Sequence, residues 1–124
     1  MAGSETFTEK NDSFVLGGFP VLTRPRTIAS GAGVLKRGTV LGQITASKKF
    51  VKALAASDDG SQNVKEILAA DVDASASDVI APTYVSGEFD QTKLIYGTGI
   101  TEAAAAEALE GTTLFLTKPL TLQS

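Results

Sequence analysis

The chain has 124 residues, a formal net charge of −3 and 43% hydrophobic residues, a combination that fits one globular domain with a real core. It contains no cysteine and no histidine, which excludes thiol nucleophiles, disulfides, zinc sites built on those residues and the Ser-His-Asp triad. No apolar run approaches the roughly 18 residues of a membrane span. The acidic balance also argues against direct binding of nucleic acid by the domain as a whole.

The first 13 residues are polar and lack hydrophobic periodicity, so residues 1–13 are predicted to form a flexible arm. At the centre of this arm Phe7 lies between two β-formers, Thr6 and Thr8. Residues 14–124 are expected to form a single β-rich domain. This domain begins with an apolar patch that consists of Phe14, Val15, Leu16 and Phe19. We expect the patch to contact the core or a partner.

The middle of the chain carries short β-like runs separated by turn residues, a spacing typical of a compact antiparallel β-domain. The predicted strands cover residues 21–28, 34–45, 49–57, 64–72, 79–89 and 93–97. The predicted turns and loops cover residues 58–61, 73–78 and 87–88. Pro25 and Pro82 favour a sheet edge or a bulge for their two strands. Read alone, residues 64–72 also fit a helix, but the flanking turn residues and the short length favour a strand.

The segment TEAAAAEALEG is predicted to form a helix, with Thr101 as N-cap and Gly111 at C′. At 100° per residue its glutamates share one arc. The opposite arc is expected to pack on the sheet and consists of Ala104, Ala105, Ala108 and Leu109. A helix of about nine residues is marginal in isolation, so it needs this packing. A strand over residues 112–117 is predicted to follow.

Several segments resemble ligand-binding motifs but lack the residues that carry the chemistry. In GVLKRGT the lysine of a phosphate-binding loop is replaced by Thr39. In YGTGITE the third glycine of a dinucleotide turn is replaced by Glu102, which would repel a pyrophosphate. The aspartates of DVDASASD lack the glycine and glutamate of a calcium-binding loop. No catalytic residue, cofactor or metal is therefore predicted.

The segment KKFVK places lysines around Phe50. Basic residues beside an aromatic ring can bind single-stranded nucleic acid. Lysines on an edge strand also deter aggregation, and the acidic total charge favours this second interpretation.

Several stretches of the chain, in their order, resemble the head decoration proteins of the phage lambda type. These stretches are ETFTE, RGTVLGQIT, KFVKALAASDDGSQNVKEILAADVDASASD and APTYVSGEFD, followed by a short helix and a closing strand. The resemblance extends from about Glu5 to Leu116 and rests on the order of the stretches. It implies a β-tulip fold that is mostly β (α+β), with one short C-terminal helix and a flexible N-terminal arm.

The resemblance also implies a capsid cement with no catalysis. Such proteins form homotrimers at three-fold and quasi-three-fold positions of the expanded head. They clamp neighbouring copies of the major capsid protein and help the shell to resist the pressure of packed DNA. The chain would be made in the host cytoplasm and would lie on the outer capsid surface of the virion, without direct contact to nucleic acid or membrane.

In this setting the arm can add a β-strand to an edge on the capsid partner, with Phe7 filling a pocket. The residues expected to bind the capsid are Glu5, Thr6, Phe7, Thr8, Phe14, Leu16 and Phe19. From the residues alone, an ordinary frayed terminus remains the alternative for the arm.

Two other function classes are weighed against the cement. A β-rich carbohydrate- or cell-surface-binding module would usually show clustered exposed aromatic residues, and Tyr84 and Tyr96 are the only tyrosines. A small enzyme would need carboxylates, lysine or tyrosine alone, and no carboxylate pair stands in a recognisable catalytic context.

Overall fold

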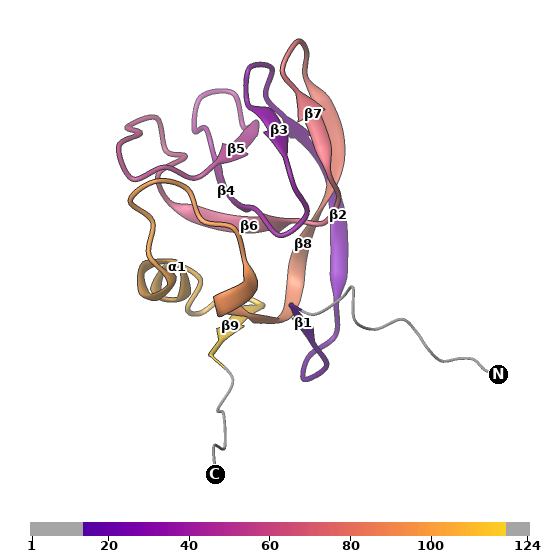
Figure 1. Ribbon diagram of the computed structural model, residues 1–124, viewed down its shortest axis with the longest axis vertical. Coiled ribbons are helices and arrows are strands. Elements are labelled where there is room, and N and C mark those ends of the chain that lie inside the picture. Colours follow the sequence, from indigo (N-terminus) through magenta and orange to yellow (C-terminus); the bar gives the residue numbers. More distant parts are fainter. Residues whose placement is uncertain (1–13, 119–124) are drawn as a thin grey trace, which may run out of the picture.

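The computed structural model describes residues 14–118, and there the protein is mostly β with one short α-helix (Figure 1). The strands are β1 (Val15–Leu16), β2 (Leu22–Ile28), β3 (Gly33–Leu35), β4 (Val40–Gln43), β5 (Phe50–Lys52), β6 (Val64–Leu68), β7 (Val72–Ala74), β8 (Val79–Asp90) and β9 (Leu114–Thr117). The helices are the 3-10 helix η2 (Gln91–Lys93) and the α-helix α1 (Glu102–Ala108). The expected fold class is confirmed, and the arm predicted for residues 1–13 lies outside the described residues.

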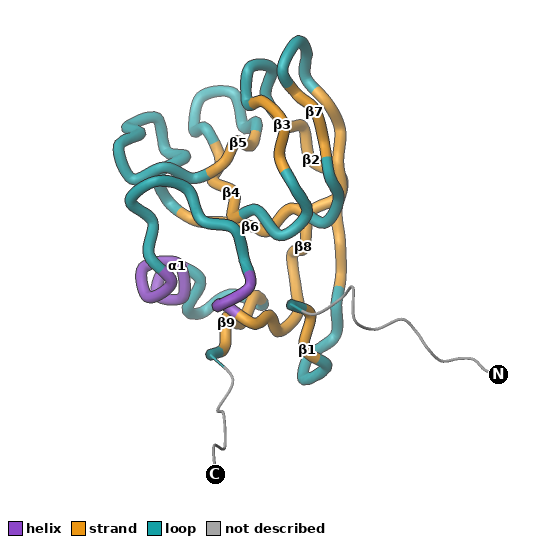
Figure 2. Tube along the Cα trace, in the orientation of Figure 1, coloured by secondary structure: helices purple, strands orange, loops and turns teal. Residues whose placement is uncertain are grey.

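The strand pairings close into a ring. Strands β8, β2, β5, β4 and β6 are neighbours in that order, and β6 pairs back with β8 (Figure 2). Strands β3 and β7 form a separate two-stranded sheet. The expected antiparallel pairing is incomplete, because β2–β5 and β8–β9 are parallel pairs. Strand β2 meets β5 only at Ile28↔Phe50, so β8 is the partner of β2 along most of its length, in agreement with the proline at position 25.

Strand β8 connects the ring to the small sheet that it forms with β1 and β9. Its first part pairs with β2, and its last residues pair with β1 on one edge and β9 on the other. The register between β2 and β8 shifts between Leu22 and Thr23, and Gly87 has a φ of 138°. The predicted turn at Gly87-Glu88 is therefore wrong. The glycine instead permits an irregular, bent strand, since a Cβ there would lie 2.8 Å from the Phe89 ring.

Other predicted elements also differ from the structure: the predicted strand over 34–45 is divided into β3 and β4, and the one over 49–57 is limited to β5. The predicted strand over 93–97 is wrong: Asp90 caps the turn of η2 through the Thr92 amide, and Ile95 forms only an isolated bridge with Thr39. Residues 64–72 adopt strand structure as favoured, but β6 ends at Leu68 and β7 begins at Val72, inside the predicted strand. The predicted loop over 73–78 therefore begins within β7.

The core consists of two clusters that share strands β4 and β6. Successive residues of a strand point to opposite faces, so Val40 and Ile67 enter one cluster while Leu41 and Leu68 enter the other. The cluster enclosed by the ring is completed by Ile28, Leu35, Phe50, Ala74 and Ala81. The cluster beneath α1 and β9 is completed by Phe14, Ala53, Val64, Tyr84, Phe89, Leu94, Ala105, Leu109 and Leu114.

The helix α1 begins where the sequence predicts. The Thr101 hydroxyl accepts a hydrogen bond from the Ala104 amide at 3.0 Å, which confirms the N-cap. Ala105 and Leu109 are buried as expected, at 0% and 2% exposed. The prediction that Ala104 and Ala108 also pack in the core is wrong, because this short helix touches the core only along one i, i+4 line.

An ion pair crosses from β2 to β6. The Arg26 guanidinium donates two hydrogen bonds of 2.9 Å to the Glu66 carboxylate, which also accepts one from the Thr83 hydroxyl at 2.6 Å. The Glu66 side chain is only 7% exposed, whereas that of Arg26 is 36% exposed. The bond to Glu66 raises the pKa of Arg26 above its ordinary value. Strands β2 and β6 are not paired directly, so this contact ties two separate parts of the ring.

We expect Arg26→Met to lower the free energy of unfolding by about 3 kcal/mol, because the mutation leaves the Glu66 carboxylate buried without its cation. The matched control is Arg24→Met, which alters an exposed arginine on the same strand and should change it by less than about 0.5 kcal/mol. Urea unfolding measures both variants. Equal effects would show that the pair does not stabilise the ring.

Candidate functional site

The candidate site lies at the end of the molecule where β1, the last residues of β8, β9 and α1 meet (Figure 1). Phe14 marks the point where the predicted arm joins this end. Its ring is 7% exposed and packs edge-to-face on Tyr84, with a centroid separation of 6.1 Å. The Arg37 guanidinium lies 4.4 Å above the same ring, and the Phe14 carbonyl accepts a hydrogen bond from the Asp90 amide at 2.8 Å. The base of the arm is therefore fastened to the core.

Leu16 and Phe19, the other predicted contacts among the described residues, are half-buried. Leu16 pairs with Glu88 across β1 and β8. The Phe19 ring packs edge-to-face on Phe115 at a centroid separation of 4.8 Å. The chain is held after this point because the Ser86 hydroxyl donates a hydrogen bond to the Pro20 carbonyl at 2.5 Å.

The structure thus brings three of the predicted contacts to one end of the fold, namely Phe14, Leu16 and Phe19. The remaining four, Glu5, Thr6, Phe7 and Thr8, lie outside the described residues. The contact of all seven with a capsid stays a prediction. The buried position of Phe14 assigns its ring to the core, whereas Leu16 and Phe19 retain exposed surface.

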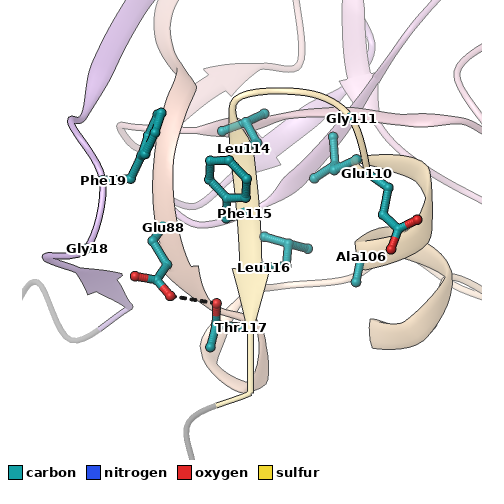
Figure 3. A pocket seen from close by; sticks show the side chains of 11 residues that line it. Gly18, Phe19, Glu88, Ala106, Glu110, Gly111, Leu114, Phe115, Leu116 and Thr117 are labelled. Atoms are coloured by element: carbon teal, nitrogen blue, oxygen red, sulfur yellow. Dashed lines mark hydrogen bonds between the residues drawn. The ribbon is translucent and has the colours of Figure 1, made fainter.

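A groove of about 650 Å³ runs beside the Phe19–Phe115 pair, between β9 and α1 (Figure 3). Its lining combines apolar side chains with two carboxylates. The lining residues are Gly18, Phe19, Glu88, Ala106, Leu109, Glu110, Gly111, Leu114, Phe115, Leu116 and Thr117. The Thr117 hydroxyl donates a hydrogen bond to the Glu88 carboxylate at 2.8 Å. A Cβ at Gly18 would meet the same carboxylate, so a side chain there would require Glu88 to move.

Sequence reasoning did not find Phe115 and Glu88 as parts of this site. Their neighbours in space come from β1, β8, β9 and α1, and no local pattern relates these segments. One signal was present: the alternation in TTLFLT places Phe115 on the face opposite Leu114 and Leu116. Leu114 is 4% exposed and Phe115 is 43% exposed, as that alternation requires.

Tyr84 offers no exposed aromatic surface to a sugar, and Tyr96 is half-buried. Tyr84 is 7% exposed and accepts a hydrogen bond from the Arg37 guanidinium at 3.0 Å. The Tyr96 hydroxyl donates to the Gln91 carbonyl at 2.6 Å. Burial raises the pKa of Tyr96 well above its ordinary value, and the nearby carboxylates of Glu102 and Asp90 add to the effect. Tyr96 therefore stays neutral at physiological pH and holds η2 in place.

The segments that resembled ligand-binding motifs have structural roles. Phe50 is 2% exposed, so its ring is not available to stack on a base, and Lys49 pairs with Asp78 at 2.7 Å. Asp78 also accepts a hydrogen bond from the Ser30 amide, and the bond to Lys49 is the main cause of its lowered pKa. Between residues 14 and 118 no group of three or more acidic side chains is placed to hold a metal ion.

No helix in the described part of the chain is long and apolar enough to cross a membrane.

We expect Phe14→Ala to lower the free energy of unfolding by about 3 kcal/mol, because it removes a buried ring from the core. Phe19→Ala should cost only about 1 kcal/mol, the value of a half-exposed aromatic pair. Thermal and urea unfolding of the two variants provide the comparison. If Phe14→Ala were the milder substitution, the fastening of the arm at this residue would be wrong.

Comparison with known families agrees with this geometry. Residues 9–115 match the family model described as bacteriophage lambda head decoration protein D, so the match covers most of the chain. A search of curated protein sequences found no match. The matched range includes the end of the predicted arm, the fastened base at Phe14 and the first two residues of β9. The chain belongs to the bacteriophage lambda head decoration protein D family.

Proposed function

We propose that this chain is a capsid cement that binds the major capsid protein as a homotrimer, at three-fold and quasi-three-fold positions of the expanded head. In this proposal the trimers lie on the outer surface and help the shell to withstand the pressure of packed DNA. The observation that carries the proposal is the family match over residues 9–115, which supports a role in decorating a phage capsid. Capsid decoration is a structural role that requires no catalytic group.

The geometry at the base of the arm supports a role for residues 1–13 in binding. The chain is pinned at Phe14 by core packing and by the bond from the Asp90 amide. Exposed apolar side chains surround this end, and they include Val21 at 43%, Leu22 at 52% and Phe115 at 43%. An extended segment that adds a strand to a partner's sheet gains main-chain hydrogen bonds, while a side chain such as Phe7 fixes the register.

Binding through an arm has an entropic cost that a trimer can offset by binding through three arms. Ordering each residue of an extended segment costs roughly 1–2 kcal/mol before compensation by new contacts. When one arm of a trimer is bound, the other two are held near their sites at a high effective concentration. Three moderate contacts then give one tight attachment.

Deletion of residues 1–13 should leave the fold intact, because the described core begins at Phe14. The same deletion should reduce binding to expanded capsids at least about 100-fold, since each trimer would lose all three arms. Cosedimentation with capsids that lack decoration protein measures the binding, and circular dichroism checks the fold. Full occupancy by the truncated protein would refute the role of the arm.

Within the arm, Phe7→Ala should weaken capsid binding more than Lys10→Ala, because an aromatic anchor contributes more than a rim charge. Both variants keep the length of the arm, so the comparison isolates the side chain. Equal effects would show that Phe7 is not an anchor.

The outer face of the β2–β8 pair is the surface that we assign to the contact between trimer subunits. Pro25 and Pro82 are direct cross-strand partners, and Thr27 pairs with Ile80 two residues further, on the same face. Both prolines are exposed, and Ile80 is 73% exposed. Exposed apolar side chains on neighbouring strands, here the two prolines and Ile80, favour a protein–protein contact.

Light scattering at several concentrations should give three times the mass of one chain for the wild type, and a lower mass for Ile80→Glu. The matched control is Val34→Glu, because Val34 is 62% exposed but pairs with a polar residue, Asp73. This control should keep the wild-type mass. A trimer that persists in Ile80→Glu would exclude this face, whereas a monomeric wild type would restrict trimer formation to the capsid surface.

A further inference from the structure

We propose that the groove between β9 and α1 binds an extended segment of the capsid partner that carries an apolar side chain and a basic side chain. This inference rests on the proposed function, because it takes a capsid as the partner. It adds a second contact, made by the folded domain, to the contact proposed for the arm. Figure 3 shows β9 in the middle of the lining, with Phe19 and Glu88 on one side of this strand and Ala106 and Glu110 on the side of α1.

One edge of β9 faces the groove. Between residues 14 and 118, β8 is the only strand that pairs with β9, in the register Gly87↔Leu114 to Asp90↔Thr117. The edge away from β8 faces α1 across the groove (Figure 3). At the start of β9 the Leu114 amide donates a hydrogen bond to the Thr112 hydroxyl at 3.1 Å, so an added strand would pair with the rest of this edge. Extended peptides join exposed sheet edges in this way.

Much of the groove lining is apolar. Leu109 and Leu114 form a buried floor, at 2% and 4% exposed. Phe115 projects from β9 toward Phe19 and keeps 43% of its surface exposed. A large ring that is held by a neighbouring ring and still open to solvent is a preformed contact for an apolar side chain, because little side-chain freedom is lost on binding.

The rim of the groove is acidic. The lining contains two carboxylates, Glu88 and Glu110, and no lysine or arginine. Within the described residues neither carboxylate forms an ion pair, and Glu88 is held by the hydroxyl of Thr117. An acidic rim around an apolar floor favours a segment with a lysine or arginine beside its apolar residue and disfavours an acidic one.

The groove lies close to the base of the arm. The base of the arm and the groove flank the same stretch of β8, since Leu16 and Phe115 both pair with Glu88. Two strand spacings separate β1 from β9, which is about 10 Å. A partner bound by the arm is therefore already next to the groove. The arm itself carries two glutamates at positions 5 and 9, so the acidic rim disfavours it as the occupant.

The test is binding of full-length variants to expanded capsids that lack decoration protein. Glu110→Lys should weaken binding about tenfold or more, because it reverses one charge of the rim. Its matched control is Glu107→Lys, which makes the same change on α1 outside the groove and should have less than about a twofold effect. Phe115→Ala should also weaken binding about tenfold, whereas Ile95→Ala, at a site 37% exposed and away from the groove, should not.

Hydrogen exchange of the wild type provides a second readout. We expect the peptide that spans residues 112–118 to gain protection when the protein binds capsids, because the free edge of β9 becomes paired. The amides of β9 that bond β8 are already protected in the free protein, so the readout is the gain in protection on binding. No gain in this peptide when the capsids are saturated would overturn the proposal.

The outcomes separate this inference from the proposed function. If the wild type does not bind expanded capsids, the proposed function itself fails. If the wild type binds and both groove variants bind equally well, the proposed function stands and the groove is not a contact.

Discussion

The bend in β8 is the constraint on which the rest of the structure depends. One strand serves two sheets: it closes the ring with β2 and β6, and beyond Gly87 it forms the centre of the small sheet with β1 and β9. The positive φ of Gly87 and its contact with the Phe89 ring make a side chain there costly. Without this bend, the base of the arm, β9 and α1 would have no common support.

Strand β8 contributes to both core clusters because its side chains alternate between its two faces. Upstream of the bend, Ala81 faces the interior of the ring, while Tyr84 packs with Phe14 and Phe89 in the second cluster. The ion pair between Arg26 and Glu66 spans the ring, and the Thr83 hydroxyl from β8 completes it. Every polar contact of Glu66 therefore comes from a different strand, so the pair stabilises the arrangement of strands and not a single hairpin.

Local signals in the sequence were sufficient where a short stretch determines its own structure. The N-cap at Thr101 was predicted correctly because the cap and its partner are three residues apart. The turn at Gly87-Glu88 was predicted wrongly because its structure depends on distant residues. The strand at 93–97 was predicted wrongly because a local cap, from Asp90 to the Thr92 amide, starts a turn there. Gly87 lies in a strand that pairs with Leu114, and Leu94 is buried in the core after the turn capped by Asp90.

The same distinction applies to the candidate site. The apolar patch at 14–19 was recognised from the sequence, but its division into a buried ring and exposed side chains depends on Tyr84 and Arg37, far along the chain. The groove could not be anticipated, since its walls come from four separate segments. The family resemblance depended on the order of short stretches along the chain, and the match over residues 9–115 confirms it.

In the proposed role the protein must hold a shell without depending on one deep pocket. The two proposed contacts, through the arm and through the groove, differ in their reach and in their entropic cost. An arm reaches far, but its ordering cost makes each contact moderate. A preformed groove has short reach, but it loses little freedom on binding and can add directional backbone bonds. Because both contacts flank the same segment of β8, force on the arm passes through Phe14 and the Asp90 amide into the strand that also supports the groove. In this proposal both contacts are supported by the same strand, so the partner would have to release both before it could leave.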